Sequence, residues 1–66
     1  MRLTINGEPH EAETARDLAA LIATLELDPR KVAVERNLEI VPRSLYGRTP
    51  VADGDRIEIV SFVGGG

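Results

Sequence analysis

MRLTINGEPHEAETARDLAALIATL, residues 1–25, joins the pattern of a β-hairpin to the pattern of a helix. Residues 1–6 alternate apolar and polar side chains with a period of two, which predicts a strand. Asn6-Gly7 is a strong signal for a tight hairpin turn, and the short polar segment 8–13 suits an edge strand. The apolar face of the first strand consists of Met1, Leu3 and Ile5.

The helix pattern consists of apolar residues at i, i+3, i+4 and i+7, which form one stripe that can pack on a sheet. The N-cap is either Asp17 itself or Thr14 in a capping box with Asp17. We expect Pro29 to end the helix, because the residue before a proline is disfavoured in helical geometry. The stripe consists of Leu18, Leu21, Ile22 and Leu25.

The rest of the chain predicts three more strands. One contains Val32 and Val34, and a turn at Asn37 leads into the apolar run 38–41. Residues 43–50 are predicted to be a loop, with one helical turn as an open alternative. The tight turn Asp53-Gly54-Asp55 precedes the last strand, 56–63. In that strand Ile57, Ile59, Ser61 and Val63 face one side, and Arg56, Glu58, Val60 and Phe62 face the other.

This order of elements predicts an α+β fold with the ubiquitin-like β-grasp topology. We expect a mixed sheet of four to five strands with one main helix packed on one face. Residues 1–63 form the predicted domain, and residues 64–66 form a flexible C-terminal glycine tail.

The composition argues against several classes of function. A formal charge of −3 and a single Phe and Tyr argue against nucleic-acid binding, which needs clustered basic residues. A mildly acidic surface instead suits a protein partner with basic patches. No stretch approaches the roughly 20 apolar residues of a membrane span, and charges near the start argue against a signal peptide. We therefore expect a soluble, cytoplasmic protein.

The end of the chain, Gly64-Gly65-Gly66, is the most informative feature for function. Glycine has no Cβ, so this segment is thin enough to enter a narrow active-site channel. Extended, it spans roughly 10 Å, enough to bring the Gly66 carboxylate to a buried nucleotide. The alternative is an idle terminal tail.

A set of short motifs occurs in a fixed order in the second half of the chain. They are Ile40-Val41-Pro42-Arg43, Tyr46, Val51, Asp53-Gly54-Asp55, Ile57, Ile59 and Gly65-Gly66. In order and spacing they resemble the sulfur carrier family of thiamine thiazole synthesis, the ThiS family, from Met1 to Gly66. Two departures are Tyr46, where many members carry tryptophan, and Gly64, which extends the usual glycine pair.

The resemblance implies a protein cosubstrate and not an enzyme. A ubiquitin-activator-like adenylyltransferase uses ATP to adenylate Gly66, and a sulfur donor, such as a cysteine desulfurase, converts the adenylate into a thiocarboxylate. Thiazole synthase then receives the sulfur. The chain itself binds no cofactor.

We expect four residues to dock these partners: Arg43, Tyr46, Val60 and Phe62. Exposed apolar residues often mark interfaces, and this applies to Val60 and Phe62. A bulge in the last strand is the alternative that places Phe62 in the core. Arg43 either pairs with acidic partner residues or is an ordinary solvated arginine.

No other chemistry is indicated. His10 is expected to be an ordinary half-buried strand residue, because one histidine without cysteines cannot complete a usual metal set, so we expect no metal site. Asp53-Gly54-Asp55 is a turn and lacks the remaining positions of a calcium loop.

Three alternative functions remain open at this stage. The small subunit of molybdopterin synthase has a similar fold and also ends in Gly-Gly. A ubiquitin-like protein modifier conjugated through Gly66 is the second alternative, and a binding module with an idle tail is the third.

Overall fold

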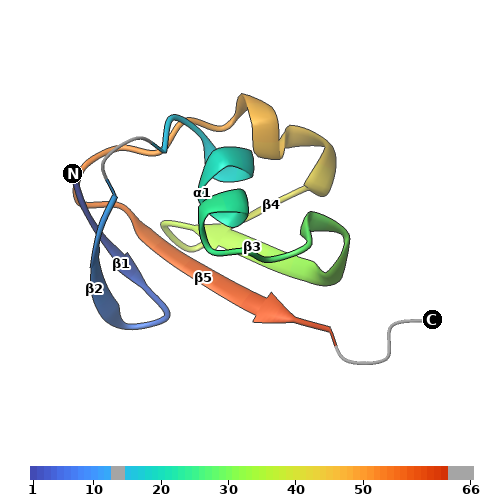
Figure 1. The fold of residues 1–66 in the computed structure, drawn as a ribbon, viewed down its shortest axis with the longest axis horizontal. Helices are drawn as coiled ribbons and strands as arrows, with labels where there is room; N and C mark the ends of the chain where they lie inside the picture. Colours follow the sequence, from blue (N-terminus) through green and yellow to red (C-terminus); the bar gives the residue numbers. More distant parts are fainter. Residues whose placement is uncertain (13–14, 63–66) are drawn as a thin grey trace.

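The computed structural model of the chain describes residues 1–12 and 15–62, and within them five strands form one mixed sheet (Figure 1). The elements are β1 (Arg2–Ile5), β2 (Glu8–Glu11), α1 (Leu18–Thr24), the 3-10 helix η1 (Pro29–Lys31), β3 (Val32–Arg36), β4 (Glu39–Val41), the 3-10 helix η2 (Arg43–Arg48) and β5 (Arg56–Ser61). The strand order is β2-β1-β5-β3-β4, in which only the β1–β5 pairing is parallel. Helix α1 covers one face, so the predicted α+β, β-grasp architecture is confirmed.

The first hairpin has the predicted turn and places β2 at the sheet edge. Asn6 and Gly7 have φ values of 51° and 82°, the positive pair that a two-residue type I′ turn requires. The Asn6 side chain also pairs with β5: its Nδ2 donates to the Ile59 carbonyl at 3.1 Å, and its Oδ1 accepts from the Ile59 N–H at 2.7 Å. The hairpin is therefore tied to the centre of the sheet.

Helix α1 begins at one of the two predicted caps. Asp17 has extended backbone angles, and its carboxylate accepts a hydrogen bond from the Ala20 N–H at 2.8 Å, so Asp17 is the N-cap. Thr14 lies outside the described residues. Leu18, Leu21 and Ile22 are buried against the sheet, as their spacing predicts.

The end of α1 corrects the expectation that Pro29 stops the helix. The Glu26 N–H donates to the Ala23 carbonyl at 3.0 Å, and the Leu27 N–H donates to the Ile22 carbonyl at 3.1 Å. Together with the left-handed φ of 59° at Glu26, these bonds form a Schellman motif, which ends the helix before Pro29. Pro29 instead begins η1.

The β3–β4 hairpin corrects a second boundary. Leu38 was expected in a strand, but it lies in the turn with φ 71°, next to Asn37 with φ 52°. Asn37 and Leu38 form the turn because the pairing of β3 with β4 begins at Arg36↔Glu39. The side chain of Leu38 is 79% exposed.

The core lies between α1, η2 and the inner face of the sheet. Segment 43–50, predicted as a loop, contains the six-residue helix η2, which packs against α1. The buried apolar residues are Leu3, Ile5, Ala15, Leu18, Leu21, Ile22, Val32, Val34, Tyr46, Val51, Ile57 and Ile59.

One buried carboxylate connects the β3–β4 hairpin to the turn before β5. Asp55 accepts hydrogen bonds from Arg36 Nε at 2.8 Å, Asn37 Nδ2 at 3.0 Å and the Ala52 N–H at 2.8 Å. Burial raises the pKa of Asp55, but the hydrogen bonds from Ala52, Asn37 and Arg36 outweigh it and hold the pKa below its usual value. The predicted turn at residues 53–55 is therefore also an anchor.

Candidate docking face and carrier terminus

Strand β5 ends with Ser61, beside the start of β3. It pairs with β3 from Arg36↔Ile57 to Val32↔Ser61, and the Phe62 N–H extends this pairing by donating to the Lys31 carbonyl at 2.7 Å. The predicted tail, Gly64 to Gly66, lies outside the described residues. Its role therefore stays a prediction.

The two faces of β5 differ as predicted. Ile57 and Ile59 are buried, whereas Val60 is 61% exposed and Phe62 is 52% exposed. The pairing with β3 is continuous, so no bulge places Phe62 in the core. Ser61, expected to face the core, is exposed at the end of the strand, and Val63 lies outside the described residues.

A shallow groove runs across the face of the sheet opposite α1. Its volume is about 130 Å³, and it passes between β4, β3 and β5. Ile40 on β4 is 76% exposed and, with Val60, gives the groove apolar sides. We call it the outer-face groove, and it is lined by Ala33, Val34, Glu35, Ile40, Glu58 and Val60.

The predicted docking residues do not form a single surface. Arg43 and Tyr46 belong to η2, which packs against α1 on the other side of the sheet from the groove (Figure 1). Arg43 is exposed. Val60 and Phe62 lie on β5 and its extension.

The prediction that Tyr46 docks a partner is wrong. Its side chain is 4% exposed, and its hydroxyl donates a hydrogen bond to the Val32 carbonyl at 3.2 Å. Burial raises the pKa of this hydroxyl, although the charge of Arg43 partly opposes the shift. A ring of this size fills the space between η2 and the sheet, so it offers a partner almost no surface.

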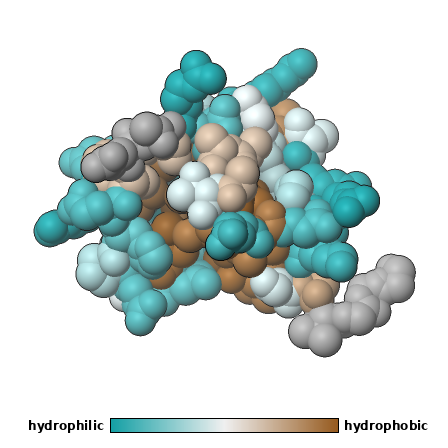
Figure 2. All heavy atoms as spheres, in the orientation of Figure 1, coloured by the Kyte–Doolittle hydropathy of each residue, from teal (hydrophilic) through white to brown (hydrophobic). Residues whose placement is uncertain are grey.

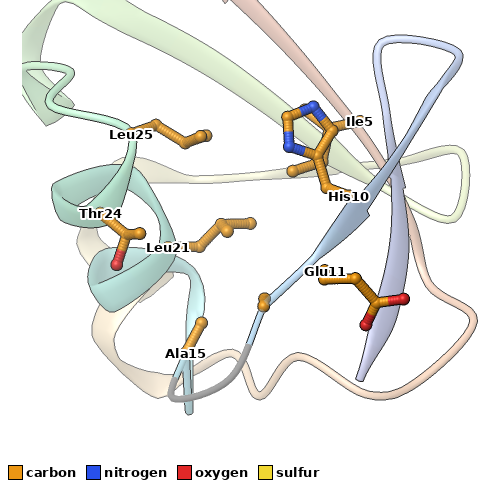
Figure 3. A pocket seen from close by; sticks show the side chains of 8 residues that line it. Ile5, His10, Glu11, Ala15, Leu21, Thr24 and Leu25 are labelled. Atoms are coloured by element: carbon orange, nitrogen blue, oxygen red, sulfur yellow. The ribbon is translucent and has the colours of Figure 1, made fainter.

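A second hollow, of about 320 Å³, lies between β2 and α1. Figure 3 shows Leu21 of α1, Leu25 just after this helix and His10 of β2 around this space. On the face of the molecule drawn in Figure 2, hydrophobic residues gather in the middle. The Thr24 hydroxyl at its margin already donates to the Ala20 carbonyl at 3.0 Å. His10 is half-buried, as expected, and residues 1–12 and 15–62 contain no group of three metal-ligating side chains.

Sequence reasoning missed two features of the outer-face groove. The sequence placed Ile40 in a strand but did not predict the face of the sheet on which its side chain lies. It also gave no sign that Glu35 and Glu58 are neighbours. The alternation in β5 indicated that Glu58 lies on the same face as Val60, but the partner of each residue across the sheet depends on strand register.

In the part of the chain that the structure describes, no helix is long and apolar enough to cross a bilayer.

Comparison with known proteins agrees with this architecture. Residues 3–66 match the model of the ThiS family. The crystal structure of the thiamine biosynthesis protein ThiS from Geobacter metallireducens superposes with a TM-score of 0.84 at 36% identity, covering all of both chains.

Curated relatives are of two kinds. The chain is 54% identical over 66 residues to a thiazole synthase of Paramagnetospirillum magneticum and 47% identical to one of Magnetococcus marinus, and it spans 20% of each. It is 48% identical over 46 residues to the sulfur carrier protein ThiS of Bacillus subtilis, covering 70% of both chains. The family model matches nearly the whole length, and the chain therefore belongs to the ThiS family.

Proposed function

We propose that this chain is a sulfur carrier of thiamine biosynthesis and that it carries sulfur as a thiocarboxylate on Gly66. Membership of the ThiS family is the observation that carries this proposal. The resemblance to the Bacillus subtilis sulfur carrier supports it. In the sequence, the glycine segment begins shortly after β5, with Phe62 and Val63 between them.

The chemistry needs a second protein. A terminal carboxylate has a pKa of about 3.5, so it is ionised at neutral pH and does not react with nucleophiles. An oxygen of Gly66 attacks the α-phosphorus of ATP, forming an acyl adenylate and releasing pyrophosphate. A hydrosulfide ion from the sulfur donor then attacks the acyl carbon, AMP leaves with its bonding electrons, and loss of the S–H proton gives the thiocarboxylate. The ATP belongs to the activating enzyme, and we place the reaction in the cytoplasm.

Thiazole synthase is the proposed recipient of the sulfur. The two thiazole synthases that resemble this chain are about five times as long and contain a segment similar to all 66 residues. A carrier segment within a synthase chain supports a functional association between the two. The carrier is a cosubstrate in both reactions and supplies no catalytic group.

The outer-face groove and Phe62 are the proposed docking surface for these enzymes. Ordering three glycines costs roughly 3–6 kcal/mol, so contacts made by the folded body must offset this loss. Exposed apolar area is offered by Val60 on β5, by Phe62 just after β5 and by Ile40 on the edge strand β4. Removing such area from water is the favourable contribution that can offset the cost of ordering the glycines.

Intact mass spectrometry tests the proposal. The chain is incubated with its adenylating enzyme, ATP and a sulfide source, and we expect one oxygen to be replaced by sulfur. The matched control is a chain without Gly64, Gly65 and Gly66, which should keep its mass. If the mass of the full chain does not change with an enzyme shown to be active, the proposal is wrong.

A further inference from the structure

Two glutamates face each other across the floor of the outer-face groove. Glu35 of β3 and Glu58 of β5 are direct partners in the antiparallel register, and Ile40 of β4 is the next residue across from Glu35. Directly opposite residues have Cβ atoms about 4.5–5.5 Å apart. Both glutamates are half-buried as whole residues.

No cation in the described part of the chain neutralises this pair. The ion pairs within 4.0 Å join Arg2 to Glu11, Arg30 to Asp28 and Arg36 to Asp55. Arg36 follows Glu35 in β3, so its side chain leaves the opposite face of the sheet. Like charges directly opposite each other destabilise a sheet. The free carrier therefore has an unfavourable feature at the centre of its docking surface.

The shape and lining of the groove match one kind of side chain. A volume of about 130 Å³ is well below the 300–1,000 Å³ of typical small-molecule pockets, so it admits a side chain and not a cofactor. A guanidinium is a planar fork of donors that can bond two carboxylates, and its aliphatic stem packs on apolar groups. Ile40, across from Glu35, and Val60, on the same face of β5 as Glu58, provide those groups.

We propose that Glu35 and Glu58 receive an arginine side chain of the adenylating enzyme and thereby select this partner. The inference rests on the proposed function, and charge complementarity assigns the arginine to this enzyme. An enzyme that binds ATP and attracts a terminal carboxylate needs a positive surface around its site, and such a surface steers an acidic partner towards it. The glutamate pair is the acidic counterpart on the same face as Val60.

Titration calorimetry with the purified adenylating enzyme tests the inference. The double variant Glu35→Gln/Glu58→Gln should bind about 10- to 100-fold more weakly than the natural chain. Its affinity should also depend less on salt, because fewer charges pair at the interface. The matched control is Glu8→Gln/Glu11→Gln, which removes the same charge from β2 at the edge of the sheet. That control should keep its affinity.

The stability of the free chain provides a second measurement. Removing a like-charge pair should raise the thermal midpoint of Glu35→Gln/Glu58→Gln by about 2–5 °C. A lower midpoint overturns the inference, because the pair would then support the fold. Unchanged affinity and salt dependence overturn it too, as does a loss of binding confined to thiazole synthase.

The outcomes for the two proposals can be separated. At saturating adenylating enzyme the double variant should still be fully converted to the thiocarboxylate, because Gly66 is intact. Absence of thiocarboxylate from the natural chain contradicts the proposed function. Even then, the affinities of Glu35→Gln/Glu58→Gln and Glu8→Gln/Glu11→Gln for the adenylating enzyme still decide whether the glutamate pair binds it.

Discussion

Arg36 Nε donates a hydrogen bond of 2.8 Å to Oδ2 of Asp55, joining the end of β3 to the turn before β5. The Asp55 side chain is 8% exposed, whereas that of Arg36 is 31% exposed. The carboxylate also holds the Ala52 N–H and Asn37 Nδ2, so its loss leaves three donors without their partner.

This relationship predicts that Asp55→Ala destabilises the fold by about 1–3 kcal/mol, since three donors of part-buried hydrogen bonds lose their acceptor. Urea unfolding monitored by circular dichroism measures the change. Asp53→Ala is the matched control, because Asp53 is exposed and accepts one hydrogen bond, from the Arg2 N–H. An equal loss in both variants would contradict the assigned role of Asp55.

The lowered pKa of Asp55 predicts a dependence of stability on pH. Its folded pKa lies below its unfolded value of about 3.9, so the charged group stabilises the fold above that pH. The contribution is lost as the pH falls through the folded pKa. We expect Asp55→Asn to lose less stability between neutral and acid pH than the natural chain. Asp28, whose pKa is lowered to about 2 by hydrogen bonds from the Arg30 side chain and backbone, is present in both chains, so the comparison between them isolates Asp55.

The left-handed Glu26 at the end of α1 predicts a stabilising substitution. A side chain with a Cβ is unfavourable at φ 59°, whereas glycine adopts this angle freely. Glu26→Gly should therefore raise the free energy of unfolding by about 1 kcal/mol. Glu26→Ala keeps the Cβ and should not give this gain, so chemical denaturation of both variants isolates the backbone effect.

The turn at Leu38 predicts a similar gain at the β3–β4 hairpin. Asn-Gly is the preferred pair for a type I′ turn, and Leu38 occupies the glycine position at φ 71°. Leu38→Gly should stabilise the free chain by roughly 1 kcal/mol, and Leu38→Ala should not. A loss of stability in Leu38→Gly, measured by thermal unfolding, would show that the exposed leucine supports the fold.

The exposed apolar surface of β5 predicts a change in docking without a change in folding. Val60→Thr keeps the branched shape of the side chain and should alter stability by less than about 0.5 kcal/mol. It removes an apolar contact, so the KM of the adenylating enzyme for the carrier should rise. Ile59→Thr is the contrasting variant: Ile59 is buried, and we expect it to unfold more easily.

Much of the fold could be predicted from the sequence because its signals are local. Asn6-Gly7 and the spacing of Leu18, Leu21 and Ile22 specify the first hairpin and the helix through backbone angles and side-chain period. The family was recognised from motif order, and the comparisons confirm it. Local signals also gave Asp17 as one of two possible caps.

The errors have two physical origins: positive φ angles at residues other than glycine, and contacts distant along the chain. Glu26 and Leu38 adopt positive φ although neither is glycine, so propensity gave no sign that a helix or strand ends there. Tyr46 has a polar end that suits a surface, but its hydroxyl finds Val32 14 residues away. The pairing of Glu35 with Glu58 depends on register, which no single strand reveals.

The position of β5 also affects how the molecule is made. This strand is the last in sequence but lies at the centre of the sheet, between β1 and β3. A nascent chain that stops before Arg56 holds two separate hairpins, and an isolated hairpin is at best marginally stable in water. The two hairpins join into one sheet only when β5 has been synthesised. Enzymes that recognise the assembled surface would therefore not bind chains that lack this strand.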